Sequence, residues 1–323
     1  MGFDVSYHPV DLDFINERLV PCLVGKADLK PLLSEAIALE KLRYRAKAWA
    51  LGALAADRGA KKPRLPTLDG MLHVWGRPFF IEAKDPAGVS DAIDAYLAAK
   101  SSGAIDSLAK KTLAALAPKL KAKIEPDMGQ GIPPRDVLLP AVTRDLDVLP
   151  EVVAAYAKGK KTMMLPSGDE GAPEAVLASS YPLLALAFMA RFRPGWMDRG
   201  HVWPTLLMSN AKLDWAKWFE PPNALFGDLA KQLPKLAKLK LSPTVDQNYT
   251  VGGYVRKSRV AGLRKLLEKS EKALLAKPKK EGWDDHARTS LRKIHEALAD
   301  AERRGMGFCE ASEIYSAPMG MLN

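Results

Sequence analysis

The segment RPGWMDRGHVWP, residues 193–204, gathers charged and aromatic residue types that could do chemistry. Asp198, Arg199 and His201 could supply a charged network or an acid–base pair. The proline and glycines of this segment are typical of a loop, where such groups are exposed. The first question is therefore whether the segment is a working surface or part of an ordinary core.

Tryptophans continue beyond this segment, so that four of the seven in the chain lie between residues 196 and 218. Tryptophan and arginine are frequent hot spots of protein interfaces. Tryptophan also has a large area that is usually buried. Three interpretations follow, in this order: an aromatic plug over the apolar helix that precedes it, a partner-binding surface, and a catalytic centre. The candidate partner-binding residues are Trp196, Arg199, His201, Trp203, Trp215 and Trp218.

A basic segment, residues 212–280, competes for the functional role. It holds 16 lysines and arginines but only 6 aspartates and glutamates, so its excess equals the formal net charge of +10 of the whole chain. Such a local charge can face an acidic protein, nucleic acid or anionic lipid, or it can simply solubilise the surface. The candidate residues for an acidic partner or another anion are Arg256, Lys257, Arg259, Arg264 and Lys265.

Several reaction classes lack their motifs in this chain. There is no GxxxxGK[ST] phosphate loop and no GxSxG elbow, and neither Cys22 nor Cys309 lies in a nucleophile motif. The pair Gly252-Gly253 is too short for a dinucleotide fingerprint and favours a turn. The five histidines show neither HExxH nor a three- or four-residue spacing. We therefore predict no cofactor and no metal site, and we lean against an enzyme.

His8 is the basis of an alternative, an enzyme with a dispersed active site. It follows a predicted strand and precedes Asp11 and Asp13 in HPVDLD, and a carboxylate could hold its imidazole in one tautomer. Asp198 and His201 are the other candidates for such a site. The simpler interpretation, which we favour, has Asp11 capping a helix while His8 packs near the turn.

Periodicity predicts the elements that must position these residues. FDVSY alternates as a half-buried strand, and an Ala- and Leu-rich pattern predicts a long helix over residues 28–57. Residues 71–83 are typical of a hairpin. Residues 174–192 are apolar nearly all round, which predicts a core helix that begins after Pro173.

Two amphipathic helices are predicted near the end of the chain. The first covers 255–276 and carries the basic face. In the second, Asp284 or Asp285 is expected to cap the start, and Gly305 ends the helix. The apolar seam of the second consists of Ala287, Leu291, Ile294, Leu298 and Ala301. The tail GFCEASEIYSAP is typical of an extended segment that could pair with the N-terminal strand.

These elements predict a helix-dominated α+β fold with about eight to ten helices and a small sheet of about three to five short strands. We expect an N-terminal α+β region over 1–123, a Gly/Pro-rich linker or loop over 124–135, and a mainly helical region over 136–323, which could also be one continuous domain. Two cysteines and the absence of a long apolar run predict a soluble, cytoplasmic protein without a membrane partner.

The composition and the absent motifs together favour a protein-binding module that recognises an acidic protein through the Trp/Arg loop and the basic helix. An immunity or regulatory protein is one version of this hypothesis. The opening MGFDVSYHPV resembles bacterial proteins of the immunity or accessory type, and no site is transferred from that short stretch. The alternatives are a nucleic-acid-associated protein that uses residues 212–280 and the enzyme with a dispersed site.

Overall fold

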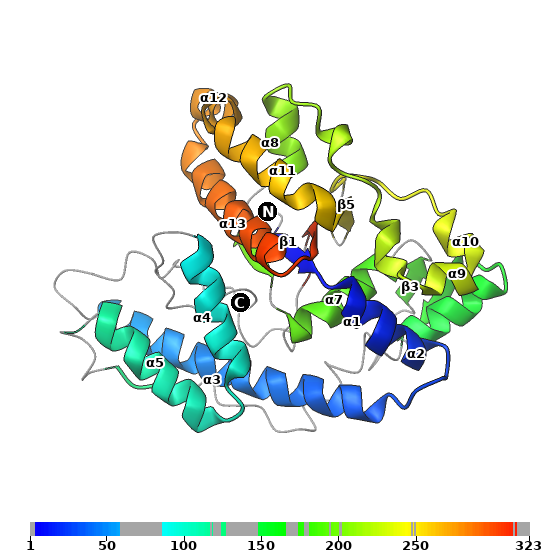
Figure 1. The fold of residues 1–323 in the computed structure, drawn as a ribbon, viewed down its shortest axis with the longest axis horizontal. Helices are drawn as coiled ribbons and strands as arrows, with labels where there is room; N and C mark the ends of the chain where they lie inside the picture. The colour runs from blue at the N-terminus through cyan, green and yellow to red at the C-terminus, as the bar shows by residue number, and fades with distance from the viewer. Residues whose placement is uncertain are drawn as a thin grey trace.

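A four-stranded antiparallel sheet in the order β4-β1-β6-β5 lies at the centre of the computed structural model (Figure 1). Its strands are β1 (Asp4–Val10), β4 (Trp196–Arg199), β5 (Val251–Val255) and β6 (Gly307–Ser312). The structure describes residues 4–58, 86–116, 118, 124–126, 148–165, 174–177, 181–193, 195–199, 202–246, 248, 250–312 and 314. The predicted hairpin at 71–83, and residues 124–135 apart from 124–126, lie outside these described residues.

The pairing of β6 with β1 confirms that the C-terminal tail adds a strand beside the N-terminal one. His8 lies opposite Cys309, and Tyr7 lies opposite Glu310. In sequence, β1 precedes residues 124–135, whereas β4, β5 and β6 follow them, and all four strands belong to the same sheet. The two regions predicted on either side of that stretch share one sheet.

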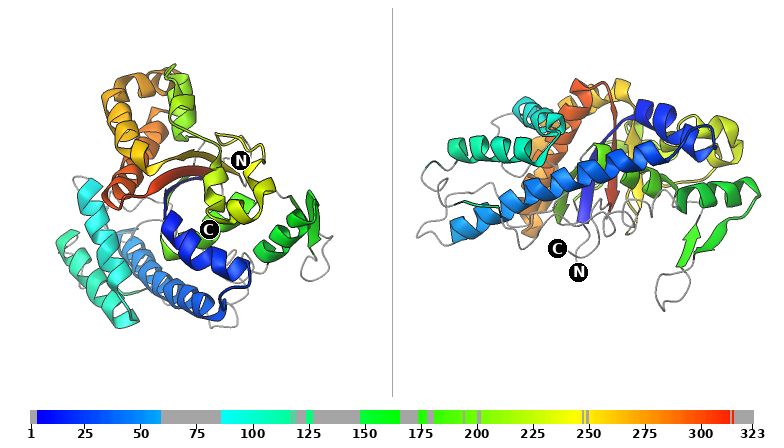
Figure 2. Two further views of the ribbon diagram at one scale, coloured as in Figure 1. Left: turned by 45° about the vertical axis from the view of Figure 1, so that its right-hand side comes forward. Right: turned by 90° about the horizontal axis from the view of Figure 1, so that it is seen from below.

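Each face of the sheet carries its own core, because successive side chains of a strand point to opposite faces. Val10, Tyr254 and Cys309 belong to the core under α3 (Lys30–Arg58) and α7 (Tyr181–Phe192). Val5 and Phe308 belong to the core under α11 (Lys257–Lys269) and α13 (Asp284–Arg303). Figure 2 shows the helices packed around the curved sheet from both sides.

Helices dominate the chain, which confirms the α+β prediction. The α-helices are α1 (Leu12–Phe14), α2 (Val20–Leu23), α3 (Lys30–Arg58), α4 (Pro86–Ala98), α5 (Ser102–Leu116), α7 (Tyr181–Phe192), α8 (Pro204–Asn210), α9 (Leu229–Gln232), α10 (Pro234–Ala237), α11 (Lys257–Lys269), α12 (Glu271–Glu281) and α13 (Asp284–Arg303). Residues 148–157 are also helical. The described residues also include a π-helix, η1 (Ile15–Leu19), and the 3-10 helices η5 (Trp215–Lys217) and η6 (Pro222–Phe226).

The long helix and the last helix agree with the sequence pattern. All five seam residues of α13 are buried. The predicted cap is wrong, because the cap residue is Trp283 and the helix already begins at Asp284. Asp284 and Asp285 therefore occupy the first turn, where their negative charge interacts favourably with the helix dipole. Asp11 caps α1 as expected, since its Oδ1 accepts a hydrogen bond of 2.9 Å from the Phe14 N–H.

Three predictions about element boundaries are wrong. The predicted helix over 255–276 is two helices separated at Ser270, preceded by β5. Residues Glu174–Leu177 form strand β3, so the core helix begins only at Tyr181. Gly252 and Gly253 lie in β5 rather than in a turn. The backbone of residues 243–245 approaches them too closely for a side chain, which accounts for glycine at both positions.

A second, two-stranded sheet pairs β2 (Thr162–Leu165) with β3. Figure 2 shows this green hairpin projecting from the rest of the molecule. Among the described residues, Met164 on β2 is the exposed large hydrophobic residue, at 58%. A search of the described helices for a long, apolar, membrane-crossing segment finds none.

Candidate functional site

The tryptophan-rich segment contributes a strand to the sheet, which corrects the expectation that it is a loop. β4 pairs antiparallel with β1, with Trp196 opposite Tyr7 and Arg199 opposite Asp4. Trp196 is 2% exposed, and its Nε1–H donates a hydrogen bond of 3.1 Å to Glu296 on α13. Trp196 therefore belongs to the core, and a partner could not reach its side chain without opening the sheet. The side chain of Arg199 and all of His201 lie outside the described part.

The other candidate tryptophans are half-buried rather than exposed. Trp203, Trp215 and Trp218 pack against the core under α11 and α13. The Trp218 ring lies so close to α11 that a Cβ on Gly262 would approach it within 2.9 Å. These rings therefore anchor the segment around η5 to the helices. Of the candidate tryptophans, these three can therefore offer a partner only the exposed edges of their rings.

The predicted anion-binding residues divide into two groups. Arg256 forms a two-oxygen ion pair with Glu220, at 2.7 and 2.9 Å from its Nε, and Arg259 contacts the same carboxylate at 3.2 Å. Arg264 is held by Glu302 and Glu268, each at 2.7 Å. These arginines join α11 to its neighbours inside the molecule.

Lys257 and Lys265 form the second group. Both are exposed, and among the described residues neither has an ion-pair partner. Of the predicted set, only these two lysines therefore have their charge free to face solvent.

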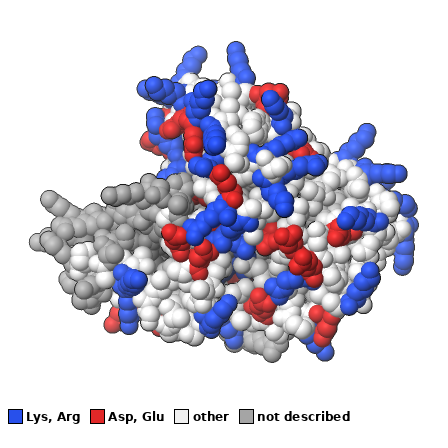
Figure 3. Space-filling model, viewed as in Figure 1, with Lys and Arg blue, Asp and Glu red and all other residues white. Residues whose placement is uncertain are grey.

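A lysine-rich basin on α11, α12 and α13 lies mostly within the predicted basic segment 212–280, but its residues were not among the predicted site residues. It encloses about 670 Å³ and is lined by Glu268, Lys269, Glu271, Lys272, Leu275, Ala276, Lys279 and Arg288. Its three lysines are exposed, and within the described part none of them makes an ion pair, whereas Arg288 contacts Asp284. Figure 3 shows Lys and Arg side chains gathered over this end of the molecule, with acidic side chains among them.

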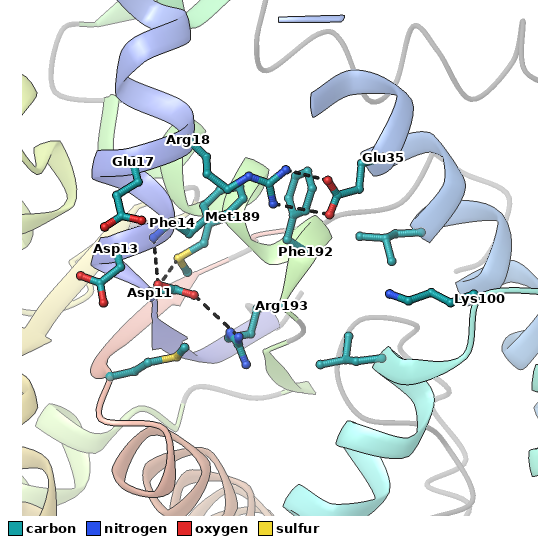
Figure 4. Close-up of a pocket in the computed structure, with 13 residues that line it drawn as sticks. Asp11, Asp13, Phe14, Glu17, Arg18, Glu35, Lys100, Met189, Phe192 and Arg193 are labelled. Atoms are coloured by element: carbon teal, nitrogen blue, oxygen red, sulfur yellow. Dashed lines mark hydrogen bonds and ion pairs between the residues drawn. The ribbon is translucent and has the colours of Figure 1, made fainter. Parts of the chain in front are cut away.

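A second cavity, of about 510 Å³, lies between α1, η1, α3 and the end of α7 (Figure 4). Residues from five separate segments line it, and it has an apolar floor that includes Phe14, Met189 and Phe192. Arg18 stacks on two of these rings, at 5.3 Å from Phe14 and 5.4 Å from Phe192, while Glu35 binds its guanidinium at 2.6 Å. Arg18 is thus fixed as part of the wall.

Arg193 is the least satisfied charge in this cavity. Its closest acidic group is Asp11 Oδ2, 3.7 Å from Nη2, which is too long for a hydrogen bond. Its Nε and Nη1 are buried without a hydrogen-bond partner. Burial lowers the pKa of Arg193, and repulsion by Arg304 lowers it further. Arg193 is the first residue of the segment 193–204, but the sequence of that segment does not show which groups surround its guanidinium.

His8 does not support the dispersed active site. It is 2% exposed, and neither of its ring nitrogens has a hydrogen-bond partner, so Asp11 does not orient it. Burial lowers the pKa of His8 to about 3, which keeps the imidazole neutral. Since Asp198 has no described side chain and His201 is not described, the described residues offer no acid–base pair at this place.

Glu310 on β6 is a further titratable group that the sequence prediction did not name. It is fully buried, and its carboxylate accepts hydrogen bonds from the N–H and hydroxyl of Thr205 and from the N–H groups of Val245 and Gly253. Burial raises its pKa to about 7, while these donors oppose the rise. Glu310 therefore holds three segments together from inside.

Comparison with known proteins gives no assignment. No family model, no curated protein and no solved structure matches the chain. Among the described residues, no group of three His, Cys, Asp or Glu side chains is arranged to hold a metal ion.

Proposed function

We propose that the chain is a protein-binding module that recognises an acidic partner through the lysine-rich basin on α11, α12 and α13. The observation that carries the proposal is the exposure of Lys269, Lys272 and Lys279 around one basin, with no carboxylate partner for any of them in the described part of the chain. Unpaired lysines attract acidic surfaces and steer their association. Lys257 and Lys265 extend the same positive surface along α11.

The basin also offers a small apolar contact. The exposed Ala276 lies among its charged residues, above the buried Leu275, which suits a protein surface with mixed chemistry. The partly buried rings of Trp203, Trp215 and Trp218 would add contacts at their edges rather than act as inserted anchors. An immunity or regulatory protein that covers an acidic face of a toxin or an enzyme is one form of this module. Two free cysteines favour the cytoplasm as its compartment.

A nucleic-acid-associated protein is the second candidate, since phosphates also attract lysines. Glu268 and Glu271 lie inside the same basin. These two carboxylates would repel a phosphate backbone, whereas a protein partner can place its own basic groups against them. The basin therefore favours an acidic protein with scattered basic residues over a polyanion.

The test begins with a pull-down from the native host, with this protein as bait, with and without nuclease. A stoichiometric protein partner that survives nuclease supports the proposal. Loss of all partners after nuclease, from a complex that absorbs like nucleic acid, supports the second candidate instead.

Charge reversal then locates the surface. We expect the combined change Lys269→Glu, Lys272→Glu and Lys279→Glu to weaken binding by on the order of tenfold or more and to reduce its salt dependence. The matched control reverses Lys158, Lys160 and Lys161, which are exposed residues before β2, and so alters the net charge equally. Equal loss in both variants would contradict a specific role for the basin.

A further inference from the structure

We infer that the cavity between α1 and the end of α7 binds a free α-amino acid, with Arg193 for the carboxylate and Asp11 for the ammonium group. This site shares no lining residue with the lysine-rich basin and goes beyond the proposed partner-binding function. A volume of about 510 Å³ is large enough for a small molecule and its water.

The unsatisfied hydrogen-bonding groups of Arg193 are the first step of the argument. An arginine with two buried nitrogens and no acceptor gives up interactions that a carboxylate could supply. A carboxylate matches the fork of a guanidinium and can accept two parallel hydrogen bonds from it. Nη2, the nitrogen beside Asp11, can donate to a ligand in the cavity that Arg193 lines, whereas a second bond from the buried Nη1 requires the guanidinium to turn toward that ligand.

Asp11 supplies the opposite charge beside it. Its Oδ1 accepts the hydrogen bond that caps α1, which leaves Oδ2 with no contact shorter than the 3.7 Å to Arg193. Figure 4 shows Asp11 and Arg193 pointing toward one another at the same end of the cavity. The carboxylate and ammonium groups of an α-amino acid are also close neighbours, so one ligand molecule can satisfy both residues.

The charges around the cavity favour a zwitterion over a bare anion. Its acidic lining residues are Asp11, Asp13, Glu17 and Glu35, and its basic ones are Arg18, Lys100 and Arg193. Glu35 neutralises Arg18, and the nearby Arg304 is held by Asp94 and Asp300. Since the acids slightly outnumber the cations, phosphate would meet repulsion, while a zwitterion adds no net charge.

The floor indicates the kind of amino acid. Leu39, Leu97 and Met306 join the rings of Phe14 and Phe192 and the side chain of Met189 in lining the cavity. These side chains can bury an apolar side chain of the ligand, which is favourable in proportion to the area removed from water. We therefore choose leucine, methionine and phenylalanine as probes.

Calorimetric titration of the full chain with these amino acids tests the site. The decisive comparison sets leucine against leucinamide, which lacks the carboxylate, and N-acetyl-leucine, which lacks the ammonium group. We expect leucine to bind on the order of tenfold or more tightly than either derivative, because each derivative loses one charge-assisted contact. Binding of none of the three amino acids, or equal binding of N-acetyl-leucine, would overturn the inference.

Variants assign the contacts. Arg193→Gln should weaken leucine binding by on the order of tenfold or more, and Asp11→Asn should do the same while keeping a residue that can cap α1. Arg292→Gln, on an exposed side chain of α13 that lines neither cavity, is the matched control and should bind leucine as the unaltered chain does. If Arg193→Gln fails to fold, Asp11→Asn decides, and unchanged leucine affinity in that variant overturns the assignment.

Discussion

At the scale of single residues, Glu310 is the group whose chemistry depends most on its surroundings. It has no contact with solvent, and its donors come from α8, from the segment at Val245 and from β5. Desolvation favours the neutral acid, whereas each hydrogen bond to its oxygens favours the carboxylate. The balance places its pKa at about 7, above the ordinary value of 4.5.

This raised pKa predicts a pH-dependent stability. Between about pH 4.5 and 7 the folded chain binds more protons at Glu310 than the unfolded chain, so the free energy of unfolding contributed by this group falls as the pH rises. The fall amounts to about 3 kcal/mol at most and is complete above pH 7. Buried His8, whose pKa is lowered to about 3, contributes the opposite slope below about pH 6.5. The measurement is therefore the difference in unfolding free energy between the unaltered chain and Glu310→Gln, from urea denaturation at pH 5, 6, 7 and 8, and this difference should fall as the pH rises to 7. An unchanged slope in that variant would contradict the assignment to Glu310.

At the scale of elements, β5 depends on two glycines. A Cβ on Gly252 would lie 2.5 Å from the Val245 backbone nitrogen, and a Cβ on Gly253 would lie 2.6 Å from the Pro243 carbonyl oxygen. We expect either change to alanine to lower the free energy of unfolding by about 1–3 kcal/mol, because a backbone segment must move. The control is Gly103→Ala in α5, where nothing lies within 4 Å. That variant should be as stable as the unaltered chain or more stable.

The junction between α4 and the end of α13 depends on two neighbouring arginines of unequal importance. Arg304 binds Asp300 at 2.7 Å and Asp94 at 2.6 Å, and Asp300 is almost completely buried. Arg304→Leu leaves that buried carboxylate without its cation, so we expect a loss of about 3 kcal/mol in unfolding free energy.

Arg303→Leu is the matched comparison for this junction. Arg303 contacts Asp91 and Asp94 from an exposed position, so its removal should change stability little. Equal urea midpoints for the two variants would contradict the predicted difference in their contributions to stability.

At the scale of the whole molecule, β6 joins parts of the chain that are far apart in sequence. It lies between β1 and β5 and contributes Phe308 to one core and Cys309 to the other. A chain that ends at Met306 is therefore expected to lose cooperative unfolding in urea, since both faces lose their central strand. Phe308→Ala is the milder test, with an expected loss of about 3–5 kcal/mol. A sharp transition at the original midpoint in either case would contradict a central role for β6.

Local sequence patterns determined much of the secondary structure. The 3.6-residue seam of α13 and the capping chemistry of Asp11 each depend on neighbours within a few positions. Alternation in FDVSY located β1 correctly, but the predicted half-buried strand is wrong, because Ser6 on the second face is as buried as Val5 on the first. The pattern failed at Ser270 and at β3, where an amphipathic stripe continued through a break or an apolar run changed from strand to helix. Short apolar runs fit both kinds of element, so only packing distinguishes them.

Only the tertiary structure decided which charged and aromatic side chains remain accessible to a partner or a ligand. Trp196 is a core residue because its strand pairs with β1. Three predicted anion-binding arginines form ion pairs within the molecule, with carboxylates that come from other elements. The hydrogen bonds of Glu310 bring together residues as far as 105 positions apart, and the cavity at Arg193 is assembled from five segments. Composition determined that the surface around residues 212–280 is basic. Burial and distance are properties of the folded chain, and they determined which of those charges can meet a ligand.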